Sequence, residues 1–264
     1  MSIFDNVFNE LRQINRKPKY VKKIHIFFEG AVSEQEVVAM IKKEFNNDEN
    51  ILSFIEISAN KPTNSIAKIS RIIKQGWYHN TEQKRTTIAK DETILLLYDV
   101  DVFYGNHGPA KKEALKKRLG LIKSLIANES VEFIWIASFP CFEYGLSLGL
   151  TSSLDKNKVL CTIDEMQVKD FLSHIAGKKF KKYDKSYKKI FYDTGKFEVS
   201  NLKTNALADR QNKNLPLTHT DFANMIKEDK LLANLKNDCP FSYLDYLFIT
   251  IENKIKEVIE NSDK

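Results

Sequence analysis

The sequence contains little cysteine, and the cysteines that it has follow no recognisable pattern. Cys141, Cys161 and Cys239 are odd in number and lie far apart in a chain of 264 residues. A disulfide framework needs paired cysteines, and a structural zinc site needs ligands at short, regular spacing. Neither kind of cross-link is indicated, and we expect the chain to belong in a reducing cytoplasm.

Long hydrophobic runs are absent as well. No segment approaches the roughly 20 apolar residues that a membrane-spanning helix needs, and residues 1–20 lack the apolar core of a signal peptide. We therefore expect no membrane partner. Hydrophobic residues make up 42% of the chain and charged residues 29%, which is typical of a folded globular protein. The net charge of +6 is compatible with a polyanionic partner.

The chain also lacks the loops and nucleophile motifs of several common enzyme classes. It has no Walker-type phosphate loop, no G-x-S-x-G motif and no Cys–His nucleophile pattern. After the first apolar segment the turn reads Glu29-Gly30-Ala31-Val32-Ser33. A carboxylate therefore stands where a dinucleotide-binding fold would begin its glycine-rich turn.

In the first 150 residues, apolar segments of strand length alternate with segments of helical periodicity. The expected strands are residues 22–28, 51–58, 93–98 and 131–137. The expected helices are residues 34–45, 63–76 and 109–128, and residues 75–90 are expected to form a polar loop. Such alternation is typical of a parallel sheet with right-handed crossovers. The predicted fold class is therefore α/β, with a parallel-sheet core of about four strands and helices on both faces.

After residue 150 the strand pattern gives way to helical segments. The expected helices are residues 167–176, 182–192, 203–212, 220–235 and 242–260, with Thr220 or Asp221 as the cap of the fourth. We therefore place a boundary near residue 155, between a first domain at 1–155 and a helical, basic C-terminal region at 156–264. The alternative is that the second part is packed decoration rather than an independent domain.

Acidic side chains follow the expected strands. The apolar segment 94–98 runs directly into Asp99 and Asp101, Glu29 follows the first strand, and Glu143 comes shortly after the fourth. The carboxyl ends of parallel strands share one edge of a sheet, where ligands gather. Converging carboxylates repel one another unless a hard cation neutralises them, and Mg²⁺ prefers oxygen ligands. For Asp99 and Asp101 alone, the alternative is a solvated acidic loop.

The order of these motifs resembles a known domain. A strand ending in Glu29-Gly30 and a later strand ending in Asp99-Val100-Asp101 are similar to the Toprim domain of topoisomerases, primases and OLD-type nucleases. With Ser33-Glu34 and Pro140-Cys141-Phe142-Glu143-Tyr144, the chain resembles more specifically the RloB-like family of bacterial restriction and abortive-infection loci. Gly145 stands where many members carry an aromatic or bulky residue, which leaves the packing of the following helix open.

The resemblance implies a Toprim-like core and metal-dependent phosphodiester cleavage in antiviral defence. Asp99 and Asp101 would hold Mg²⁺ or Mn²⁺, Glu29 would be a further ligand or the general acid/base, and Glu143 a ligand or a neighbour of one. The substrate would be DNA or RNA, with tRNA as one candidate. A partner ATPase or sensor protein is expected, and an oligomer is left open. The alternative is a non-catalytic Toprim-like binding or sensor module.

A lysine-rich segment with interleaved aromatic residues lies in the C-terminal region. Lysines neutralise phosphates and aromatic rings stack on bases, as nucleic-acid grooves require. The alternative is a solvated helix face whose tyrosines point to the core. The predicted nucleic-acid-binding residues are Lys178, Lys179, Lys181, Lys182, Lys185, Lys188 and Lys189.

Overall fold

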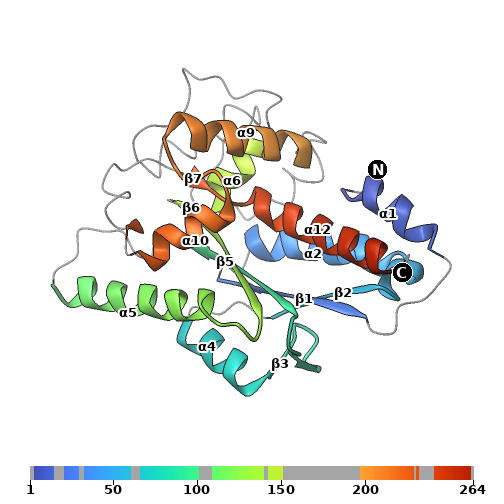
Figure 1. Ribbon diagram of the computed structural model, residues 1–264, viewed down its shortest axis with the longest axis horizontal. Helices are drawn as coiled ribbons and strands as arrows, with labels where there is room; N and C mark the ends of the chain where they lie inside the picture. Colours follow the sequence, from blue (N-terminus) through green and yellow to red (C-terminus); the bar gives the residue numbers. More distant parts are fainter. Residues whose placement is uncertain are drawn as a thin grey trace. The chain divides into compact units, whose positions relative to one another are not determined.

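A computed structural model of the chain describes residues 3–14, 21–29, 33–60, 66–100, 109–139, 142–150, 197–228, 230–231 and 241–262. These residues form an α/β fold with a five-stranded sheet in the order β2-β1-β5-β6-β7 (Figure 1). The strands are β1 (Lys22–Phe28), β2 (Ile55–Ala59), β5 (Thr93–Asp99), β6 (Glu132–Phe139) and β7 (Phe241–Ser242). The predicted α/β class is confirmed, and each of the four predicted strand segments contains a strand of this sheet. The sheet is mixed rather than purely parallel, because β7 is a fifth strand that pairs antiparallel with β6.

The chain divides into two compact units that are interleaved in the sequence. The first contains Met1–Leu97, Asn128–Trp135 and Leu247–Lys264, and the second contains Tyr98–Ala127 and Ile136–Tyr246. The domain boundary expected near residue 155 falls outside the described residues and stays a prediction. None of the helices that the structure describes combines the length and apolar character that a bilayer crossing requires.

The first unit is built on parallel strands that are buried on both faces. β1 pairs in parallel with β2 and with β5, and its apolar residues from Ile24 to Phe28 are at most 1% exposed. Helix α2 (Ser33–Asn46) connects β1 to β2, and α4 (Ile66–Gln75) lies between β2 and β5 in the chain. The connection through α2 leads from β1 to β2 on one side of it, and the connection through α4 leads back across β1 to β5 on the other side. Right-handed crossovers in these two opposite directions place α2 and α4 on opposite faces of the sheet.

Aromatic packing joins α1 (Asp5–Arg12), α2 and α12 (Asp245–Ser262) in the first unit. Phe4, which precedes α1, contacts Phe45 of α2 and Phe248 of α12, and the ring centroids are 5.6 and 6.3 Å apart. Phe8 meets Phe45 edge to face at 5.1 Å. Such large, fully buried rings dominate the energetics of a core, so the two chain ends stabilise the same unit.

Two local predictions in the first unit were wrong. The strand expected at 51–58 begins at Ile55, because α3 (Glu49–Leu52) precedes it, and Asp48 caps α3 by accepting hydrogen bonds from the N–H groups of Asn50 and Ile51. The loop expected at 75–90 contains an antiparallel hairpin of β3 (Trp77–His79) and β4 (Arg85–Thr87). Strands of three residues are too short to show a period in the sequence.

The second unit contains α5 (Pro109–Ile126), α6 (Phe142–Gly149), α9 (Val199–Asn212), α10 (His219–Lys227) and β7. β7 pairs antiparallel with the end of β6, through Ser138 with Ser242 and Phe139 with Phe241. The helix expected at 242–260 therefore starts only at Asp245. Thr218, rather than Thr220 or Asp221, caps α10 by accepting the N–H of Asp221. The helices expected at 167–176 and 182–192 lie outside the described residues.

Glycines let α6 approach its neighbours closely. A Cβ atom at Gly145 would clash with the Ser242 hydroxyl and come within 2.9 Å of the Leu244 Cβ, and one at Gly149 would clash with the Phe197 ring. The packing that Gly145 left open in the sequence is thus resolved: the missing side chain makes room for β7 and the residues after it.

Candidate functional site

Glu29 lies at the carboxyl end of β1, as the sequence predicts. Its N–H donates to the carbonyl of Leu97 at 3.1 Å, which continues the parallel pairing of Phe28 with Leu97 by one residue. The residue is half-buried. The first unit therefore fixes the Glu29 backbone beside the last part of β5, two residues before Asp99 in the chain.

Asp99 is the last residue of β5 and contacts the start of α6 within the second unit. Its Oδ2 accepts the backbone N–H of Phe142, the first residue of α6, at 3.1 Å. Next to it, the N–H of Val100 donates to the carbonyl of Ser138 in β6 at 2.8 Å. The first N–H groups of a helix lack partners inside the helix, and its dipole favours negative charge at that end. Asp99 is thus placed where a carboxylate is stabilised.

Glu143 lies in the first turn of α6 and is half-buried. The second unit therefore brings Asp99 and the turn that carries Glu143 together, as the sequence predicts for one edge of the sheet. Glu29 belongs to the first unit and Asp99 to the second, so their convergence on one ion stays a proposal. Asp101 lies outside the described residues. Within the described part of the chain, no three His, Cys, Asp or Glu residues gather as a metal-binding group.

A buried polar cluster anchors α6 to α9. The Tyr144 hydroxyl donates to Asp209 Oδ1 at 2.8 Å, and Lys213 Nζ donates to the Tyr144 hydroxyl at 2.8 Å. Lys213 also pairs with Asp209 at 2.6 Å, and the two side chains are 3% and 0% exposed. Burial raises the pKa of Asp209 above its ordinary value, although Lys213 pulls it in the other direction. A buried carboxylate of this kind depends on its cation.

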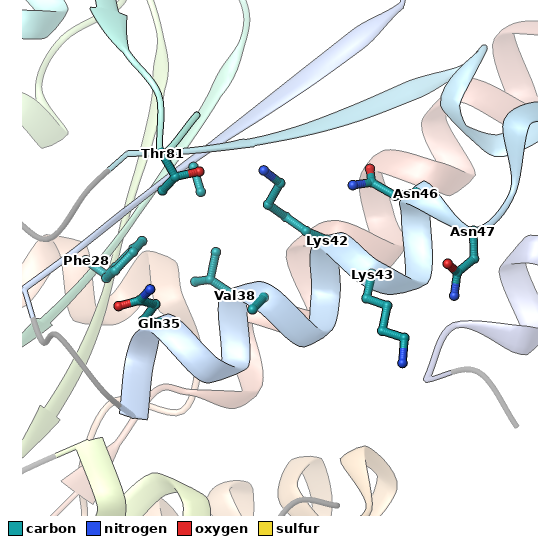
Figure 2. A pocket seen from close by; sticks show the side chains of 10 residues that line it. Phe28, Gln35, Val38, Lys42, Lys43, Asn46, Asn47 and Thr81 are labelled. Carbon is teal, nitrogen blue, oxygen red and sulfur yellow. The ribbon is translucent and has the colours of Figure 1, made fainter. Parts of the chain in front are cut away.

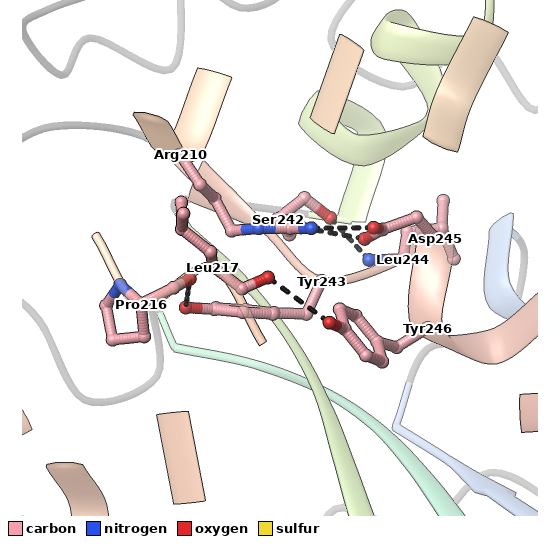
Figure 3. A network of polar contacts seen from close by, with 8 residues as sticks. All are labelled: Arg210, Pro216, Leu217, Ser242, Tyr243, Leu244, Asp245 and Tyr246. Atoms are coloured by element: carbon pink, nitrogen blue, oxygen red, sulfur yellow. Dashed lines mark hydrogen bonds and ion pairs between the residues drawn. The ribbon is translucent and has the colours of Figure 1, made fainter. Parts of the chain in front are cut away.

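A second buried ion pair joins α9 to the start of α12 (Figure 3). Arg210 donates to both carboxylate oxygens of Asp245, at 2.8 and 2.7 Å, and to the carbonyl of Ser242 at 2.8 Å. Its guanidinium lies over the Tyr243 ring at 4.7 Å and near the Tyr246 ring at 5.4 Å. Burial alone would lower the pKa of Arg210, but the contact with Asp245 raises it. Arg210 therefore stays charged and fixes the chain between β7 and α12.

Sequence reasoning missed both ion pairs. Asp209 and Lys213 stand four residues apart, which is the spacing of an ordinary surface pair on a helix, and nothing in the sequence marks them as buried. Tyr144 lies in the Pro-Cys-Phe-Glu-Tyr motif, but no role was predicted for its side chain. The lysines predicted to bind nucleic acid, within 178–189, lie outside the described residues, and their role stays a prediction.

Comparisons of the chain with protein-family models, with curated proteins and with solved structures find no match.

Proposed function

We propose that the chain is a Toprim-type nuclease that depends on Mg²⁺ or Mn²⁺. The observation that carries the proposal is the pairing of β1 with β5. These neighbouring strands are parallel, Glu29 directly follows β1 with its N–H on Leu97, and Asp99 ends β5. Between β1 and β5 the order of the strands reverses direction, and ligands of open α/β sheets bind at such a point, beyond the carboxyl ends of the strands.

The donor chemistry of these residues fits a hard divalent cation. Glu29, Asp99 and Asp101 offer carboxylate oxygens, which are the ligands that Mg²⁺ and Mn²⁺ take, and these three would hold the ion. When bound, such an ion neutralises phosphate charge, lowers the pKa of bound water and stabilises the leaving oxygen.

The chain's own residues have separable tasks in this proposal. The N-terminus of α6 holds Asp99 through the Phe142 N–H, so that its carboxylate keeps one orientation. Glu29 serves as a ligand or as the general acid/base that moves a proton at the scissile phosphate. Glu143, one residue after Phe142, lies in the same turn and is a further ligand or a neighbour of one.

The biological setting follows from the resemblance to RloB-like proteins. We propose an antiviral, abortive-infection effector that cleaves DNA or RNA, with tRNA as one candidate substrate. Toprim effectors of defence systems often act with an ATPase encoded alongside, and we therefore propose an ATPase or a sensor protein as the partner.

The test is cleavage of plasmid DNA and total RNA by the purified chain, with Mn²⁺ or with EDTA, beside Glu29→Gln and Asp99→Asn. An asparagine side chain also offers an oxygen that accepts a hydrogen bond, so Asp99→Asn retains an acceptor for the Phe142 N–H while it removes the charge. Both variants should melt like the wild type and lose cleavage. Full activity in both would refute the metal mechanism.

The contact between Asp99 and Phe142 also favours a second candidate function, a non-catalytic binding or sensor module. In that case Asp99 only caps α6. Titration with Mn²⁺ discriminates the two. The nuclease should bind the ion and lose binding in Asp99→Asn, whereas a module in which Asp99 is only a cap should show neither effect.

A further inference from the structure

The first unit carries a groove along α2 (Figure 2). It has a volume of about 390 Å³ and is formed by one side of α2, by the ends of β1 and β2, and by the turn between β3 and β4. Its apolar lining comes from Phe28 and Ala59 at the strand ends and from Val38 and Ala39 of the helix. Cavities of this size accommodate ligands of nucleotide dimensions.

The polar lining of the groove carries positive charge. Its ten residues include Lys42 and Lys43 and no acid. Figure 2 shows Lys42 reaching from α2 toward the space beside Thr81. Lys42 pairs with Glu82 at 3.0 Å, and Glu82 also pairs with Lys84 at 3.1 Å, so this carboxylate is shared by two lysines.

Carboxamides complete the polar lining at both ends of the helix. Gln35 lies in the first turn of α2 beside Phe28, and Asn46 and Asn47 lie at its C-terminal end. Carboxamides both donate and accept hydrogen bonds and can therefore contact base edges as well as phosphates. From Gln35 to Asn46 the helix rises by about 16 Å, which is enough for several phosphates at the strand spacing of about 3.4 Å.

The position of the groove relates it to the candidate site. Phe28 lines it, and Glu29 is the next residue of the chain. A strand that passes Glu29 and continues along α2 would meet lysines and carboxamides in succession over an apolar floor. This combination suits a nucleic-acid strand, since its phosphates, base edges and ring faces would each find a partner among cations, amides and apolar surface.

We propose that this groove binds a single nucleic-acid strand beside the cleavage site, with Lys42 and Lys43 neutralising phosphates and the carboxamides contacting bases or backbone. The assignment rests on the proposed nuclease function, and it names the surface on which the substrate lies. It is separate from the lysines within 178–189.

The test measures binding without cleavage. The chain of 264 residues is titrated in EDTA into fluorescein-labelled single strands of mixed sequence, one RNA and one DNA, and the dissociation constant is read by anisotropy over a range of salt concentrations. For single strands the salt slope becomes smaller by about 0.7 for each phosphate that is no longer neutralised. The double variant Lys42→Gln/Lys43→Gln should therefore bind more weakly, with a slope smaller by about 1.4. If the double variant loses the same affinity for RNA and for DNA, the lysines contact the phosphate backbone. If it loses more affinity for RNA, they also contact the 2′-hydroxyl.

A variant that is expected to tighten binding distinguishes an effect on the groove from a folding defect. Glu82→Gln leaves Lys42 without its carboxylate partner and should tighten binding. Two controls change charge elsewhere in the first unit. Lys74→Gln on α4 and Glu260→Gln on α12 alter exposed residues that do not line the groove. Lys74→Gln should weaken binding less than the double lysine variant does, and Glu260→Gln should tighten it less than Glu82→Gln does.

The outcomes separate this inference from the proposed function. If the double variant binds both strands with the wild-type slope, or if Lys74→Gln has an equal effect, the groove is not the binding surface, even if the wild type cleaves with Mn²⁺. If the groove variants change the affinity as expected while the wild type shows no cleavage, the groove assignment is supported and the nuclease mechanism is refuted. Failure of the wild type to bind either strand at low salt would overturn the groove assignment.

Discussion

Removing Lys213 should cost the protein much more stability than removing an exposed lysine. In Lys213→Met, the carboxylate of Asp209 remains fully buried and keeps only the Tyr144 hydroxyl as a donor among the described residues. Breaking a buried ion pair by removing one partner typically costs about 3–5 kcal/mol, because an uncompensated charge is left behind. At about 2–4 °C per kcal/mol for chains of 150–250 residues, the melting temperature should fall by roughly 6–20 °C.

The matched control is Lys227→Met, which removes an exposed lysine of α10 from the same unit. It should change stability by no more than about 0.5 kcal/mol. The double variant Asp209→Asn/Lys213→Met removes both charges and should be more stable than Lys213→Met alone. The coupling in this double-mutant cycle then measures the pair itself. Urea unfolding, followed by circular dichroism, gives the four free energies.

The pH dependence gives an independent check of the same prediction. Burial already raises the pKa of Asp209, and removal of Lys213 should raise it further. A carboxyl whose folded pKa lies above its unfolded value destabilises the fold at neutral pH, and this destabilisation disappears as pH falls and the group is protonated. The deficit of Lys213→Met should therefore shrink as the pH is lowered from neutral into the acidic range. A deficit equal to that of Lys227→Met, or one that does not depend on pH, would refute the buried ion pair.

Two further predictions concern other parts of the chain. Burial would raise the pKa of Glu92, but hydrogen bonds from His25 and from the Ala89 N–H lower it. Glu92→Gln should therefore be less stable than the wild type at neutral pH. Below about pH 4.5, where the unfolded carboxyl becomes protonated, urea unfolding should show a smaller further loss of stability in the variant than in the wild type. Gly145→Ala should cost about 1–3 kcal/mol by overpacking against Ser242. Gly120→Ala, in open space on α5, should stabilise by up to about 1 kcal/mol, and equal effects of these two substitutions in thermal melting would contradict the packing of α6.

The strands that the sequence predicts well are those whose burial is continuous. Residues 94–98 form an unbroken apolar run, and the structure buries all of them at 1% exposure or less. β7 was missed because two residues, Phe241 and Ser242, show no periodicity, and their strand conformation depends on pairing with β6. Local pattern can predict an element that buries its own surface, but it cannot predict one that exists only because a distant strand offers partners.

The candidate site shows the same division between local and distant information. Glu29, Asp99 and Glu143 are found from sequence because each follows a recognisable apolar segment. The structure places Glu29 directly after β1, Asp99 at the end of β5 and Glu143 in the first turn of α6. The support of α6 was not predictable. Asp209 and Arg210 are adjacent charged residues on a helix, a pattern that usually indicates a solvated face, yet they are 0% and 1% exposed.

The packing of α6 bears on how the C-terminal half contributes to the candidate site. α6 begins at the Asp99 carboxylate, and its next turns are fixed by residues far along the chain, through Asp209 and Lys213 on α9 and through Ser242 of β7 against Gly145. Without these partners, the Tyr144 ring and hydroxyl would be left without their buried neighbours, and the N–H that binds Asp99 would no longer be held in a fixed position. α9 and β7 are therefore part of the structural support of Asp99.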